Sequence, residues 1–178
     1  MSGEMRESFH VFTRTYSGLA KCGHIKTECA VAAEGKAPKI KNLCAIWDTG
    51  CRVTTISREL AEKLALKSEK SVSVNTVGGV AKNGQHQISL LLPANLFFQN
   101  LTVHSGSLSG CDVLVGLDII SKGSFSISNT QDETIFSFQI PTEEIIDFQY
   151  GLPTIQTIDY NDPINKKPHW WQRIFKRN

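Results

Sequence analysis

Alternating hydrophobic and polar positions run through most of the chain and predict β-strands. Segment 8–16, SFHVFTRTY, is rich in aromatic and β-branched residues, which is typical of a strand. Comparable stretches follow at 27–33, 39–47, 71–77, 85–92, 100–108, 111–120, 124–129 and 134–141. Many short strands separated by turn residues predict an all-β protein built on a closed or nearly closed sheet.

The period of the pattern changes in segment 57–66, SRELAEKLAL. Ile56, Leu60 and Leu64 recur every four residues, with charged residues between them. This spacing predicts a short amphipathic helix with Ser57 as its N-cap. The period of two then returns on both sides of GGVAKNG, where Asn83-Gly84 predicts a tight hairpin.

Composition limits the classes of protein that fit. The 178 residues suggest one domain, and 40% hydrophobic with 20% charged residues allows a packed core and argues against wholesale disorder. A net charge of +2 makes no case for nucleic-acid binding. No apolar stretch reaches the length of a membrane span, and MSGEMRESFH lacks the hydrophobic block of a signal peptide. We therefore expect a cytoplasmic protein.

The character of the chain changes after Pro141, where prolines become frequent and the alternation is lost. We expect a folded domain over residues 8–145 and a basic C-terminal extension over 146–178. The end of this extension, KKPHWWQRIFKRN, combines basic and aromatic residues. It could form an interfacial helix on anionic lipid or bind nucleic acid. We favour a tail whose aromatic residues pack on the protein, with no nucleic acid bound.

Five cysteines are present, an odd number without a disulfide framework. Cys22, His24 and Cys29 lie close together and raise the alternative of a metal site. Their spacing is not a CxxC pair, and no second pair completes four ligands. We expect free, mostly buried thiols, with no metal and no cofactor.

The strand at 39–47 runs directly into Asp48, Thr49 and Gly50. An acid at the end of an apolar run is costly to bury unless its charge is used or satisfied. By itself the tripeptide is more typical of an Asp-led turn than of a catalytic site. Further along, a second apolar run contains Leu114-Val115-Gly116.

The order of these motifs resembles the retropepsin-like aspartic proteases, the single-lobed retroviral type, here as a bacterial-type member. In that family a strand delivers Asp-Thr/Ser-Gly to a loop. The segment after it supplies Thr or Ser, a hydrophobic residue and often Ser, which here are Thr54, Ile56 and Ser57. A hydrophobic–hydrophobic–Gly stretch packs beneath the loop, as 114–116 would, and a short helix follows. The resemblance covers roughly residues 8–141 and implies a retropepsin-like closed β-barrel with one or two short helices.

The resemblance also implies a reaction and a set of site residues. Asp48 is the expected catalytic residue, with Thr49 and Gly50 supporting the active-site loop. Gly78 and Gly79 are the expected substrate-binding residues of a flap formed by the hairpin around 77–85. Because the chain contains only one Asp-Thr-Gly and no Asp-Ser-Gly, the second acid must come from another copy. The expected protein is a homodimeric endopeptidase acting on peptides or unfolded proteins.

Three residues near the acid depart from the family pattern: Trp47, Cys51 and Arg52 stand where smaller or differently charged residues are usual. They leave the substrate preference open. Two alternatives to the protease remain: a non-catalytic module of the same fold that dimerises or binds peptides, and a metal- or cysteine-dependent protein.

Overall fold

The computed structural model describes residues 10–16, 23–38, 40–76, 79–129 and 133–142. This part of the chain is mostly β-strand, with two short α-helices and one turn of 3₁₀ helix. The strands are β1 (His10–Tyr16), β2 (Lys26–Ala33), β3 (Ile40–Trp47), β4 (Thr55–Ser57), β5 (Lys70–Thr76), β6 (Gly79–Leu92), β7 (Leu96–Gly106), β8 (Val113–Val115), β9 (Ser124–Asn129) and β10 (Thr134–Ile140). The helices are α2 (Arg58–Lys63), α3 (Leu117–Ile120) and the 3₁₀ turn η1 (Pro93–Asn95).

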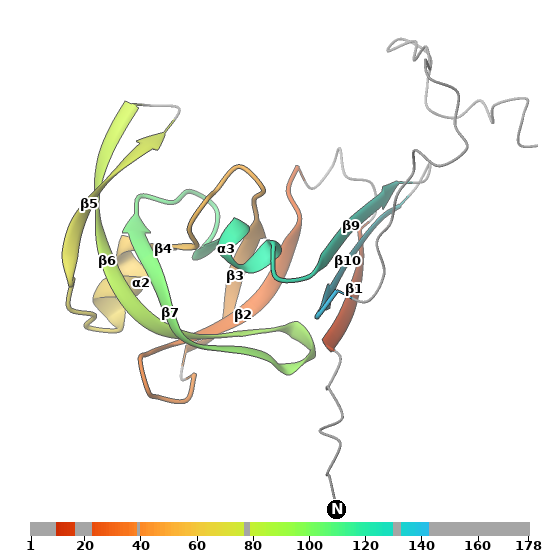
Figure 1. The fold of residues 1–178 in the computed structure, drawn as a ribbon, viewed down its shortest axis with the longest axis horizontal. Coiled ribbons are helices and arrows are strands. Elements are labelled where there is room, and N and C mark those ends of the chain that lie inside the picture. Colours follow the sequence, from red (N-terminus) through yellow and green to blue (C-terminus); the bar gives the residue numbers. More distant parts are fainter. Residues whose placement is uncertain (1–9, 17–22, 39, 77–78, 130–132, 143–178) are drawn as a thin grey trace, which may run out of the picture.

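Six strands close into a barrel. They follow the order β2-β3-β8-β4-β7-β6, and β6 pairs again with β2 to complete the ring. β5 adds to the outer part of β6 as an antiparallel hairpin that rises from the barrel (Figure 1). The predicted all-β closed barrel with short helices is therefore confirmed.

A second sheet lies beside the barrel, in the order β1-β10-β9 (Figure 1). Its strands are antiparallel, and β1 pairs with β10 along its whole length, from His10 opposite Ile140 to Tyr16 opposite Thr134. The first and last described strands of the chain thus share one sheet. Phe136 and Phe138 of β10 are fully buried against the barrel.

The barrel core is built from the inward-facing residues of almost every strand. Val31, Ile56, Ile88, Val103 and Val113 come from five different strands and are all fully buried. Burial of such a side chain contributes about 1.5–3 kcal/mol to folding. The alternation recognised in the sequence therefore corresponds to one contiguous core.

The described cysteines carry free thiols. Cys29 is buried in the core, and this burial raises its pKa to about 12. Cys44, Cys51 and Cys111 are half-buried, so the thiols are more accessible than expected. Cys22 lies outside the described residues, and the candidate metal set that includes it stays untested.

The helix at 57–66 is confirmed in a shorter form as α2. The Ser57 hydroxyl accepts a hydrogen bond from Leu60 N at 3.1 Å, so Ser57 is the N-cap that the sequence predicts. Leu60 and Ala61 are the buried residues of this helix. The short helix expected after Gly116 is also present, as α3.

The hairpin prediction at Asn83-Gly84 is wrong. Both residues lie inside β6, where Asn83 pairs with Val72 and Gly84 with Ser71 of β5. The chain reverses between Thr76 and Gly79, which pair with each other. β6 is therefore one strand of 14 residues rather than a short strand starting at 85.

None of the helices within the described ranges is long and apolar enough to cross a membrane. The segment after residue 142 lies outside the described residues. The division between a domain at 8–145 and an extension at 146–178 stays a prediction, as does the packing of the tail.

Candidate active site

Asp48 follows β3 directly and stands where that strand leaves the barrel. Its backbone N–H donates to the carbonyl of Val115 in β8, at 3.0 Å, so the parallel β3–β8 pairing extends up to the acid. Its Oδ1 accepts the N–H of Gly50 at 2.8 Å, and its carbonyl accepts the N–H of Cys51 at 3.1 Å. The motif is thus both an Asp-led turn and a fixed, half-buried carboxylate.

Thr49 and Gly50 form the exposed tip of this turn. A Cβ on Gly50 would stand 3.1 Å from Asp48 Oδ1, so a side chain there would crowd the carboxylate. No hydrogen bond joins the Thr49 hydroxyl to another described residue. The tip therefore presents its polar groups outward.

A second carboxylate, that of Asp118 in α3, accepts hydrogen bonds from the part of the active-site loop that leads into β4. Thr54 donates to it through its backbone N–H, at 3.0 Å to both oxygens, and through its hydroxyl, at 2.7 Å. The same hydroxyl accepts the N–H of Gly116 at 3.1 Å. Thr54 is fully buried, so Asp118 satisfies polar groups that would otherwise be orphaned.

Gly116 lies against the backbone of the active-site loop. A Cβ at this position would stand 2.8 Å from the Cys51 carbonyl oxygen and 2.9 Å from Thr54 N. The next residue, Leu117, donates its N–H to the Cys51 carbonyl at 2.7 Å. The stretch 114–116 therefore packs beneath the loop, as the sequence predicts.

Trp47, immediately before the acid, links the loop to the second sheet. Its ring centroid lies 5.1 Å from Phe136 and 4.9 Å from Phe138, and its Nε1–H donates to the Thr27 hydroxyl at 3.0 Å. Aromatic pairs at this separation stabilise by about 0.5–1.5 kcal/mol beyond their burial. Sequence reasoning noted Trp47 as a departure but missed this role, because its aromatic partners Phe136 and Phe138 lie about 90 residues away.

Cys51 and Arg52 follow the turn with different exposure. Burial is the main cause that raises the pKa of the Cys51 thiol, and the Asp48 charge adds to the rise. Its Sγ–H donates to the Val53 carbonyl at 3.0 Å. The thiol therefore packs as a small neutral group, while Arg52 is exposed.

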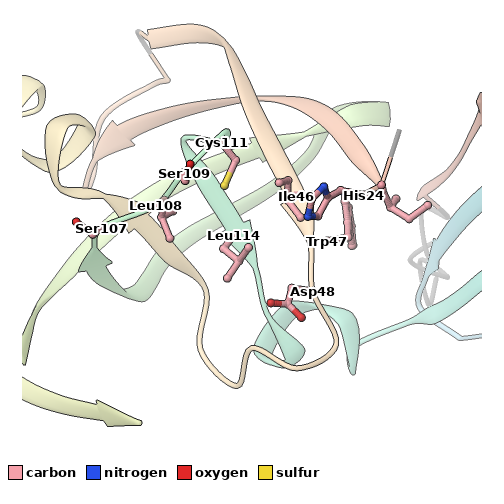
Figure 2. Close-up of a pocket in the computed structure, with 11 residues that line it drawn as sticks. His24, Ile46, Trp47, Asp48, Ser107, Leu108, Ser109, Cys111 and Leu114 are labelled. Carbon is pink, nitrogen blue, oxygen red and sulfur yellow. The ribbon is translucent and has the colours of Figure 1, made fainter. Parts of the chain in front are cut away.

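A cavity of about 550 Å³ opens beside Asp48 (Figure 2). Apolar side chains of Ile46, Leu108 and Leu114 line much of it, and Ser107 and Ser109 add hydroxyls. The remaining lining residues are Gly23, His24, Ile25, Trp47 and Cys111. A hollow with both apolar and polar lining residues next to a carboxylate is suited to holding a side chain of a ligand whose backbone passes the acid.

Gly79, the predicted flap glycine that the structure describes, is not among the residues that line this cavity. Gly79 begins β6 with φ of +110°, a backbone conformation that favours glycine, and Gly78 lies outside the described residues. Val80 is 72% exposed near the end of the hairpin. The substrate-binding role of Gly78 and Gly79 stays a prediction.

We expect Asp118→Ala to lower the free energy of unfolding by about 2–3 kcal/mol, because it leaves the buried Thr54 donors without an acceptor. Asp118→Asn is the matched control, since its amide oxygen can still accept from the Thr54 hydroxyl, and it should lose about half as much. Urea unfolding measures both. Equal stability of Asp118→Ala and the wild type would contradict this role for Asp118.

The comparisons with known proteins cover the segment that contains this site. Residues 40–122 match the family model described as "gag-polyprotein putative aspartyl protease", a little under half of the chain. The matched segment includes Asp48, Thr54, Gly116 and Asp118. This confirms the predicted resemblance to the retropepsin-like aspartic proteases.

Solved structures of such proteases are similar at low identity. A retropepsin-like aspartic protease from Rickettsia conorii is 19% identical, with a TM-score of 0.49 over 75% of this chain and 94% of that one. EIAV protease in complex with the inhibitor HBY-793 is 12% identical, with a TM-score of 0.43 over 55% and 86%. Simian foamy virus (mac) protease is 14% identical, with a TM-score of 0.38 over 55% and 92%. A search of the curated proteins finds no significant match.

Proposed function

We propose that this chain is an aspartic endopeptidase that acts as a homodimer, with one Asp48 carboxyl from each subunit. The observation that carries the proposal is the Asp48-Thr49-Gly50 turn, held at the end of a barrel strand and open to a cavity. The aspartyl protease family match over this segment supports it.

The chemistry requires two acids. Hydrolysis of an amide needs a water made nucleophilic and a leaving nitrogen that becomes protonated. Two carboxyls a few ångströms apart do not both ionise readily, so the pair holds one proton between them. The ionised carboxyl takes a proton from water, while the protonated carboxyl hydrogen-bonds the substrate carbonyl and later protonates the nitrogen.

The surroundings of the turn support contact with a second copy. Thr49, Gly50 and Arg52 are exposed at its tip, and Leu117 beside them is 40% exposed although it is a large apolar residue. In a two-fold dimer the same patch serves both subunits. Thr49 would then donate or accept across the axis and hold the two turns rigid.

The substrate is a peptide or an unfolded protein. An extended backbone would pass Asp48 and place a side chain over Ile46 and Leu114 in the cavity. The hairpin of β5 and β6 would close over it, with Gly78 and Gly79 near its end. The runner-up function is a non-catalytic module of the same fold that dimerises or binds peptides without cutting them.

Activity that depends on protein concentration tests the dimer. Because each subunit supplies half of the catalytic pair, we expect the rate per subunit in a peptide-library digest to fall on dilution, as dimers dissociate. A statine-type peptide inhibitor should block the cleavage. Sedimentation velocity at the same concentrations gives the fraction of dimer. Undiminished cleavage by a sample that sediments as a monomer would contradict the proposal.

A further inference from the structure

One face of the barrel wall carries a row of residues that runs from a basic side chain to the cavity. Lys26 of β2 pairs with Ile46 of β3, and Ile46 pairs with Leu114 of β8. Directly paired residues in a sheet point to the same face. Ile46 and Leu114 line the cavity, and Lys26 lies next to this lining on the same face, one strand further across the sheet.

His24 lies two residues before Lys26, so its side chain is expected on the same face of the sheet as Lys26. Trp47 N donates to the Ile25 carbonyl at 3.0 Å, so the ladder between β2 and β3 continues past Lys26 toward Asp48. His24 is exposed and lines the cavity. Figure 2 shows it beside Ile46, across the hollow from Leu108.

The positive charge of Lys26 reaches the cavity wall. Burial raises the pKa of the Cys111 thiol, and the Lys26 ammonium opposes that rise. Cys111 is itself a lining residue. Lys26 is therefore close enough to act on a charged group inside the hollow.

Within the described ranges, neither basic side chain is engaged by an ion pair or a side-chain hydrogen bond. The acids on this face are otherwise placed: Asp112 accepts the Cys44 N–H at 2.8 Å, and Glu28 lies one pair further from the cavity, opposite Cys44. Asp48, the expected catalytic acid, is the other described acid on this face, and it lies at the end of the cavity where cleavage would occur. Among the residues that the structure describes, His24 and Lys26 thus form no ion pair with an acid.

We infer that Lys26 and His24 select substrates with an Asp or Glu side chain next to the apolar residue held over Ile46 and Leu114. This inference rests on the proposed function and names its substrate class. An ammonium and an imidazole N–H both donate to a carboxylate, and the imidazole does so whether or not it is protonated. The substrate class is an extended peptide with adjacent apolar and acidic residues.

The test uses three peptides built around the same large apolar residue. The positions on both sides of that residue carry Glu in the first peptide, Gln in the second and Lys in the third. For the wild type we expect kcat/KM to be about two- to fivefold higher with Glu than with Gln, which corresponds to the upper part of the range for an exposed charge pair. Lys26→Gln should reduce this ratio toward one, and Lys26→Glu should reverse it in favour of Lys peptides. Lys36→Gln, an exposed charge in the turn after β2, is the matched control and should keep the wild-type ratio.

The outcomes separate this inference from the proposed function. Cleavage of all three peptides at equal rates, or an unchanged preference in Lys26→Glu, overturns the inference and leaves the peptidase intact. If no peptide is cut, the peptidase fails, and fluorescence anisotropy of the same labelled peptides on the full-length chain decides the inference. Tighter binding of Glu peptides that reverses in Lys26→Glu supports it, and binding that is equal or absent for all three overturns it.

Discussion

Asp48→Asn should lower peptide cleavage by at least about a thousandfold, because an amide can neither share the proton nor take one from water. The substitution keeps the size of the side chain, and its amide oxygen can still accept the Gly50 N–H that fixes the turn. The fold and the dimer should therefore survive. The measurements are kcat/KM on a cleaved library peptide, with the melting temperature and sedimentation as checks on folding.

Asp112→Asn is the control for this substitution. It removes an acid from the neighbouring strand end, where the carboxylate accepts a backbone N–H rather than facing the cavity. We expect its activity to stay within a few-fold of the wild type. Asp48→Asn with activity comparable to Asp112→Asn would favour the non-catalytic module, as would a wild type that dimerises but cuts nothing.

Dimers that combine a wild-type and an Asp48→Asn subunit give a more specific test of the shared active site. If both acids of a dimer are needed, wild-type and Asp48→Asn chains mixed in equal amounts and allowed to exchange should retain about a quarter of the wild-type activity, the fraction of fully wild-type dimers. If each subunit acted alone, about half would remain. The experiment distinguishes a shared active site from two independent ones without relying on the absolute rate.

The barrel could be predicted from the sequence because its signals are local. Alternation over five to ten residues identifies a strand wherever one face is buried, and Ser57 before a four-residue period identifies α2 and its cap. The end of β3 at Trp47 was also visible, since the apolar run stops at an acid. These features place Asp48 at a strand terminus without any knowledge of the fold.

The error at Asn83-Gly84 has a physical cause. The dipeptide is a good turn former, but Gly84 is needed where three side chains converge on it inside the sheet. A Cβ there would stand 2.8 Å from His86 Nε2 and 3.0 Å from the hydroxyls of Ser105 and Ser68. Packing across strands therefore explains this glycine, and local propensity assigned it to a turn.

The parts of the site that the sequence did not reveal are long-range contacts. Asp118 and Thr54 are 64 positions apart, and the aromatic partners of Trp47 are further from it along the chain. The sequence GLDII does not show which groups Asp118 will accept hydrogen bonds from. Thr54 comes close to Asp118 only when β3, β4 and β8 pair. The order of the motifs was enough to locate the active-site loop. The residues that hold this loop in place became visible only in the three-dimensional structure.

Gly116→Ala should destabilise the protein by about 2–4 kcal/mol, as overpacking of a rigid contact does. The atoms that a Cβ would meet, Cys51 O, Thr54 N and Val53 C at 2.8–2.9 Å, are all backbone, and they belong to the loop that follows Asp48. To admit a methyl group the loop must move away from β8 or the helix α3 must shift. Either movement displaces Asp48 relative to a second copy, so we also expect a large loss of cleavage.

Gly106→Ala is the matched control, because the atom nearest to its Cβ is the side-chain amide of Asn83, at 3.2 Å. A side chain can move where the backbone of a paired loop cannot, so we expect this variant to lose less than about 1 kcal/mol. Urea midpoints for the two variants measure the difference. If Gly116→Ala unfolds at the same urea concentration as Gly106→Ala, the active-site loop moves easily to admit the methyl group. The close packing of Gly116 on this loop then cannot be what holds the Asp48 carboxylate in place.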